Sequence, residues 1–300
     1  MSTDSPPHAA GQPTIVVGVD GSDANAGALR WAAEEVRRRG ARLCLVWAVT
    51  EELRTHADTF FSGPDVDGEV SASLASTREL LRQPPNESLE VDTEVVVGHA
   101  ATVLASASRD AALLVLGRRG RGVFTRLLLG SVSASAACRS TVPAVVVPGS
   151  WGPQDHAGDP VVVGVDANQA NEDAMRFAFE FALAHGLPLR AVHVSDTVDV
   201  SSWAPPETAA DPVWRKAVAE RLDGAISPWC DRYPAVNVSR IVRQGHPVAE
   251  LLDAAVDAQA VVVGGRPHRR LPAEILGSVT LGVLDHADRP VVVAHGGHAG

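Results

Sequence analysis

Short apolar runs rich in β-branched residues alternate along the chain with alanine-rich stretches in which apolar residues recur at helical spacing. In the first half the runs are residues 14–19, 43–49, 89–97, 113–116 and 144–147. Leu29, Ala32 and Val36 follow helical spacing after the first run, as do Val103 and Ala107 after the third. Strands that are apolar almost throughout predict a parallel sheet with both faces covered by helices. The predicted order is βαβ, a longer connection, then βαβαβ.

The second half repeats this pattern. VVGVD at residues 16–20 returns at 162–166, GHA at 98–100 returns as GHP at 245–247, and LLGSV at 128–132 returns as ILGSV at 275–279, so the offset is 146 and then 147 residues. The predicted strands are 161–165, 189–194, 238–243, 260–263 and 291–294. An offset of this length indicates a duplicated domain, not a short structural repeat.

We therefore predict a tail at 1–13, a domain at 14–148, a linker at 149–159 and a second domain at 160–295. The linker is rich in Gly, Pro and polar residues. The region after the second strand of each half, about 50–68 and 196–212, contains Pro, Gly and Asp that break any pattern, and is predicted to form a long variable loop.

Composition narrows the functional classes. The formal charge of −10 disfavours a general nucleic-acid or anionic-membrane surface, so a phosphate group would have to be held locally. Lys216 is the only lysine, so arginine must supply positive charge. Three cysteines without a CxxC motif indicate reduced thiols. With no secretory start or apolar run of eighteen residues, we expect a cytoplasmic protein that does not enter membranes.

A glycine-rich segment after the fourth strand is the strongest local signal. Gly117 follows LLVL, Gly120 follows two arginines, and Gly130 and Ser131 open a predicted helix. Glycines let backbone approach phosphate oxygens, and a helix N-terminus favours anions. Arg118, Arg119 and Arg121 would add charge. The alternative is that the glycines only make turns and that Ser131 is an ordinary N-cap.

Asp20 ends the first predicted strand and precedes Gly21, Ser22 and Asp23. A carboxylate there can accept hydrogen bonds from a ribose or an adenine edge. The alternative is that Asp20 holds its own loop while Ser22 or Asp23 caps the helix. We expect Asp20 and the glycine-rich segment to come from adjacent strands.

Both halves resemble universal stress protein domains. The family hallmark is Gly, two residues, Gly, nine residues, Gly, then Ser or Thr, and Gly117, Gly120, Gly130 and Ser131 match it. The aspartate after the first strand, the turn at Gly98 and the closing PAVVV also match. The resemblance implies a flavodoxin-related, Rossmann-like doubly wound fold of five parallel strands per domain, ATP binding with or without Mg²⁺, and dimer formation through the last strand.

The resemblance also assigns site residues. It implies that Asp20 and Ala48 face the adenosine, with Gly18 and Val19 behind them. Leu116 to Gly120, Gly130, Ser131 and Val132 would hold ribose and phosphates.

The second copy departs from the hallmark, because Pro267 stands where Gly120 stands in the first. Proline lacks an N–H donor and adds a ring where backbone must approach phosphate. The corresponding residues that remain are Asp166, Val194, Gly264, Gly277, Ser278 and Val279. Arg266 or Arg269 could compensate. Two interpretations stay open: a weakened nucleotide site, or none.

Other signals are weaker. His295 and His298 form a loose pair without a third metal ligand, so we expect no metal site there. His193 is expected in the core or at an edge. Trp203, Trp214 and Trp229 either pack over the second sheet or present a protein-binding surface.

The favoured function is an ATP-binding regulator in the stress response, with at most slow hydrolysis, acting as an intrachain pseudo-dimer, with homodimers and unidentified protein partners also expected. No hydrolase, metalloprotease or P-loop motif is present. The alternatives are an adenine-nucleotide α-hydrolase, although DGSDAN at 20–25 lacks the usual SGGxDS-like loop, and a scaffold with vestigial pockets.

Overall fold

A computed structural model covers the chain, and the structure describes residues 12–50, 66–81, 85–119, 129–152, 158–166, 171–195, 212–265 and 276–295. The first half below means residues 12–152, and the second half means 158–295. The segments 51–65 and 196–211, where variable loops were predicted, lie outside the described residues, as do Gly120, Arg121, Trp203, Arg266, Pro267, Arg269 and His298.

Five parallel strands form the sheet of each half, as predicted. In the first half they are β1 (Thr14–Gly18), β2 (Arg42–Val49), β3 (Val91–Val97), β4 (Leu113–Gly117) and β5 (Ala144–Val147). In the second they are β6 (Val161–Gly164), β7 (Leu189–Ser195), β8 (Val238–Gln244), β9 (Ala260–Gly264) and β10 (Val291–Ala294). Both halves have the doubly wound strand order, β3-β2-β1-β4-β5 and β8-β7-β6-β9-β10.

The helices occupy two layers. One face of the sheet packs against α1 (Ala26–Arg39), α3 (Val66–Leu81), α6 (Glu172–His185) and α7 (Pro212–Arg232). The other packs against α4 (Ala100–Ala107), α5 (Ser131–Arg139), α8 (Pro247–Asp253) and α9 (Ser278–His286). Each face has one apolar core that continues across both halves. None of the described helices is long and apolar enough to cross a membrane.

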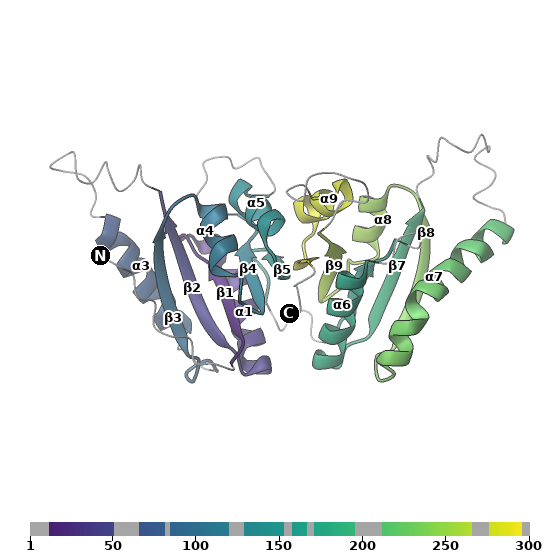
Figure 1. Ribbon diagram of the computed structural model, residues 1–300, viewed down its shortest axis with the longest axis horizontal. Helices are drawn as coiled ribbons and strands as arrows, with labels where there is room; N and C mark the ends of the chain where they lie inside the picture. The colour runs from purple at the N-terminus through teal and green to yellow at the C-terminus, as the bar shows by residue number, and fades with distance from the viewer. Residues whose placement is uncertain are drawn as a thin grey trace.

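The two halves join through their last strands, which confirms the expected pseudo-dimer (Figure 1). β5 and β10 pair antiparallel, with Val146 opposite Val291 and Val145 opposite Val292. This pairing makes one ten-stranded sheet and satisfies two strand edges that would otherwise expose backbone N–H and C=O groups. We call the β5–β10 pair, and the side chains that cross it, the seam.

The longer connection between the second and third strand of each half contains a helix. In α7, Val218, Leu222 and Ile226 recur at intervals of four and are at most 2% exposed. Val70 and Leu74 of α3 show the same spacing. α3 and α7 lie on the same face of the sheet as α1 and α6. Each connects two parallel neighbouring strands, β2 to β3 and β7 to β8, which need a crossover of this kind.

Aromatic packing on α7 settles one alternative. Trp229 stacks with Phe179 at a centroid distance of 6.0 Å and with Tyr233 at 6.3 Å, and it packs against the core of that face. The packing interpretation is therefore confirmed for Trp229. His193 is also buried as expected, and its Nδ1 lies 2.9 Å from the carbonyl oxygen of Val165.

Candidate functional site

The switch point of each sheet lies between its first and fourth strands. β1 pairs with β4, so their carboxyl ends meet at one edge. The helix that follows β1 covers one face, whereas the helix that follows β4 covers the other. The two connections therefore diverge at this edge, which is the place where doubly wound proteins bind ligands. The adjacency expected for Asp20 and the glycine-rich segment is confirmed.

Asp20 organises the loop after β1. Its Oδ1 accepts hydrogen bonds from the Ser22 backbone N–H at 3.0 Å, from Ser22 Oγ at 2.7 Å and from Asn25 Nδ2 at 2.6 Å. These bonds hold the short 3-10 helix η1 (Asp23–Asn25) against the end of the strand. Ser22 makes no side-chain cap bond, so the capping role considered for it is wrong.

Asn25 connects Asp20 to the glycine-rich segment. A Cβ on Gly117 would lie 2.8 Å from Asn25 Oδ1 and 3.2 Å from the Ala24 carbonyl oxygen. A side chain at residue 117 would therefore displace the Asn25 amide and press on the Ala24 carbonyl. Sequence reasoning missed Asn25, although its counterpart Asn171, 146 residues later, was a visible signal.

The N-terminus of α5 lies beside the end of β4. Gly130 is its N-cap and donates its N–H to the Arg118 carbonyl at 2.8 Å. Ser131 is the first helical residue and is exposed, so the interpretation of Ser131 as the N-cap is wrong. Val132 is 38% exposed. Backbone N–H groups at such a helix start attract anions.

A buried hydroxyl fixes α5 to β4. Ser133 Oγ donates to the Gly117 carbonyl at 2.6 Å, and the corresponding Thr280 Oγ1 donates to the Gly264 carbonyl at 2.8 Å. The motif stops at Ser131, so sequence reasoning missed this bond as well. The signal was that a hydroxyl recurs at the same position of both halves.

The remaining residues predicted for the first site lie at or just beyond the carboxyl ends of β1, β2 and β4. Val19 and Leu116 are buried, and Ala48 is partly buried near the end of β2. A Cβ on Gly18 would lie 2.9 Å from the Leu104 methyl carbons, so Gly18 lets α4 approach the sheet.

The two described arginines of the glycine-rich segment, Arg118 and Arg119, have different surroundings. The Arg118 guanidinium crosses the seam, where Nη1 donates to the Ala287 carbonyl and lies 3.8 Å from Asp288 Oδ1. Burial and the neighbouring Arg119 lower the pKa of Arg118, against the opposing effect of Asp288. Arg119 is exposed. In this arrangement Arg118 joins the two halves.

The corresponding edge of the second half has a different geometry. Asn171 Oδ1 accepts a hydrogen bond from the Ala174 N–H at 3.3 Å and so caps α6. Its amide nitrogen fills the space beside Gly264 where a Cβ would lie. Asp166 follows β6 as Asp20 follows β1, Val194 is partly buried near the end of β7, and Gly277 caps α9 ahead of Ser278 and Val279.

Metal ligands do not gather within the described part of the chain, where no group of three His, Cys, Asp or Glu side chains could hold an ion. His295 is engaged elsewhere, because its Nε2 lies 2.7 Å from the Ala137 carbonyl across the seam. All three cysteines are free thiols, as predicted.

Comparison with known proteins agrees with this architecture. The profile of the Universal stress protein family matches residues 13–148 and 158–295. This chain belongs to the universal stress protein family. It is 33% identical over 287 residues to Universal stress protein Rv2623 of Mycobacterium tuberculosis, covering 93% of this chain and 95% of the relative. It is also 33% identical over 289 residues to a universal stress protein of Mycolicibacterium smegmatis, covering 93% and 96%.

A solved structure that spans both halves shows the same fold. The crystal structure of a universal stress protein from Archaeoglobus fulgidus has a TM-score of 0.64 and 18% identity, covering 94% of this chain and 98% of that one. A shorter universal stress protein, solved in complex with cAMP, is 29% identical over 46% of this chain and 98% of its own, with a TM-score of 0.36.

Proposed function

We propose that this universal stress protein binds ATP at the β1–β4 edge of its first half and uses nucleotide occupancy to regulate partners or its own assembly during stress in the cytoplasm. The observation that carries the proposal is the convergence of Asp20, Gly117 and the start of α5 at one switch point. We expect any ATP hydrolysis to be slow, because Asp20 is the one carboxylate among the residues proposed to form the first site. Its Oδ1 already accepts the hydrogen bonds that order the loop after β1.

Each part of the site suits a part of the nucleotide. Asp20, at the end of β1, and Ala48, near the end of β2, lie at the strand ends where adenosine would bind. Gly117 and Gly130 present backbone without side chains, and the exposed Ser131 hydroxyl stands at the start of α5. In a chain of net charge −10, a helix N-terminus supplies local attraction for phosphates. Mg²⁺ would be held mainly by the phosphate oxygens and water.

The second half is proposed to bind nucleotide weakly or not at all. Two differences support this proposal: Pro267 replaces the second glycine of the motif, and the Asn171 amide lies against Gly264. The stoichiometry expected for the chain is therefore one ATP.

Calorimetric titration with ATP tests the proposal. Ser131→Ala removes an exposed hydroxyl and should weaken binding about three- to tenfold, the range of one lost hydrogen bond. Gly117→Val should also weaken binding, because the new side chain would meet Asn25 and Ala24 and displace the hydrogen bond from Asn25 to Asp20. The matched controls Ser278→Ala and Gly264→Val change the second half. Unchanged affinity in both first-half variants would refute the site, and two equivalent ATP molecules per chain would refute the weakened second site.

A further inference from the structure

A cavity of about 130 Å³ lies between the two halves, on the face of the sheet that α1 and α6 cover, and none of the residues that line it belongs to the proposed nucleotide site. Its walls come from α1, α6 and the segments that join strands and helices. Leu187 and Gln259 line it and stand just before β7 and β9, which places the cavity at the amino ends of these strands. It has no part in the proposed ATP site.

Two buried polar atoms without a hydrogen-bond partner belong to residues that line this cavity. They are Trp151 Nε1, which can only donate, and Gln259 Oε1, which can only accept. Trp151 as a whole is 4% exposed. Among the described residues, four buried side-chain N or O atoms lack a partner, and two of the four belong to residues that line this one cavity. Since buried polar groups are normally paired, the cavity calls for a molecule that both accepts and donates.

Both residues are held in place through the backbone. Arg30 of α1 donates from Nε to the Trp151 carbonyl at 2.8 Å and from Nη2 to the Gly149 carbonyl at 2.8 Å. The Gln259 N–H donates to the Pro160 carbonyl at 2.9 Å. The backbone positions of the donor and acceptor residues are therefore fixed before binding, which lowers the conformational entropy that binding costs there.

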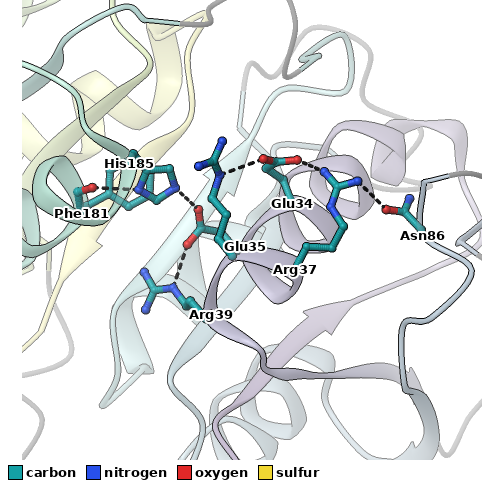
Figure 2. A network of polar contacts seen from close by, with 8 residues as sticks. Glu34, Glu35, Arg37, Arg39, Asn86, Phe181 and His185 are labelled. Carbon is teal, nitrogen blue, oxygen red and sulfur yellow. Dashed lines mark hydrogen bonds and ion pairs between the residues drawn. The ribbon is translucent and has the colours of Figure 1, made fainter.

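The charged side chains at the cavity are already paired with one another. His185 Nε2 lies 2.6 Å from Glu35 Oε1, and Arg39 Nε donates to Glu35 Oε2 at 2.8 Å (Figure 2). Arg38 Nε donates to Glu34 Oε1 at 2.8 Å. A charged ligand would have to compete with these ion pairs, so the cavity favours a neutral one.

Aromatic rings supply the apolar wall. Trp31 and Phe181 line the cavity, are each 2% exposed, and stack with an interplanar angle of 3°. A cavity of this size is close to that which holds a benzene ring, at roughly 150 Å³. Water could satisfy the two polar atoms, but against the rings it is poorly held, and an apolar body that displaces it gains affinity.

We propose that this cavity is a second ligand site, for a small neutral aromatic carboxamide. The carbonyl of the ligand accepts from Trp151 Nε1, its amide N–H donates to Gln259 Oε1, and its ring lies against Trp31 and Phe181. Because the walls come from both halves, the ligand stabilises the seam and raises the unfolding temperature of the chain.

Three probes of similar shape test this assignment by ligand-observed NMR on the full chain. Benzamide carries both an acceptor and a donor, benzoate carries acceptors only, and benzylammonium carries donors only. We expect benzamide to bind at least threefold more tightly than either ion, and to raise the midpoint of thermal unfolding. Equal binding of all three probes would overturn the proposal. So would the absence of benzamide binding at 10 mM, which is roughly the weakest affinity expected of such a small ligand.

Two variants locate the bound molecule. Trp151→Phe keeps a ring but removes the N–H donor, and Gln259→Met keeps the length but removes the acceptor. Each should weaken benzamide binding about three- to tenfold, as for one lost hydrogen bond. Trp229→Phe, in the distant α7 packing, is the matched control and should leave affinity unchanged. Unchanged affinity in the Gln259 variant and in a folded Trp151 variant would show that benzamide binds elsewhere.

Discussion

His185 of α6 pairs with Glu35 of α1 across the seam, with Nε2 and Oε1 2.6 Å apart and both side chains buried. The two positions are not equivalent in the duplication, because Phe181 corresponds to Glu35 and Arg39 to His185. Phe181 lies under the His185 ring at a centroid distance of 3.9 Å. The contact is therefore asymmetric and occurs once in the tandem chain. Two identical domains related by a twofold axis could form such a contact only twice or not at all.

This pair makes the seam sensitive to acid. Burial alone would raise the pKa of Glu35, but the hydrogen bonds and charges of His185 and Arg39 outweigh it, and the pKa falls below its ordinary value of 4.5. A lowered pKa in the folded state gives stability that is present above 4.5 and is lost as pH falls through the folded-state value. We expect the unfolding free energy of the native chain to decline more steeply below pH 4.5 than that of Glu35→Gln. Parallel curves from denaturant unfolding between pH 3 and 7 would contradict this.

The Ser133 hydroxyl should matter for both stability and nucleotide binding. Ser133→Ala leaves the Gly117 carbonyl buried without its partner at 2.6 Å, at a cost of about 1–3 kcal/mol. Because the same bond sets the start of α5 against β4, ATP affinity should fall too. Thr280→Val removes the matching bond of the second half and should destabilise the chain without changing ATP affinity at the first site. Urea unfolding and calorimetry of the two variants separate these effects.

The thiols should differ in reactivity. Burial, with Glu94 and Asp92 nearby, raises the pKa of the Cys44 thiol to about 12. The reactive thiolate is then about one part in 10⁴ at pH 8. Cys138 and Cys230 are partly exposed. When the native protein is alkylated and analysed by mass spectrometry, Cys44 should be the last of the three thiols to be modified. It should react at a rate comparable to that of Cys138 and Cys230 only after denaturation. Early modification of Cys44 in the native protein would show that its strand opens readily.

Much of the fold was predictable because the signals are local and occur twice. Each β-branched run that was predicted as a strand overlaps a strand of the structure, and the apolar last strands indicated the pairing of β5 with β10. The helices α3 and α7 were missed because glycine and proline near their starts obscured a regular spacing of apolar residues. The spacing of four residues between Val218, Leu222 and Ile226 was the signal that indicated a helix in this region.

The candidate site was predictable only in part. Glycines and Asp20 carry a motif, and their adjacency follows from strand order. The side-chain directions do not follow from sequence. Arg118 stands in the motif, yet its guanidinium reaches the Ala287 carbonyl of the other half. That direction depends on how the seam packs, which in turn depends on contacts between residues 169 positions apart.

The seam should make the two halves unfold together. Val146 is 1% exposed and lies opposite Val291 in the antiparallel pair. Val146→Asp would bury a charge without a partner, at a cost on the order of 3–5 kcal/mol. The matched control is Val95→Asp on the outer strand β3, where the side chain is 49% exposed and the cost should stay within about 0.5 kcal/mol. Calorimetry should show one transition in the parent, shifted down as a whole by Val146→Asp. Two separate transitions in the parent, with only one moved by the change, would show that the halves are energetically independent despite their shared sheet.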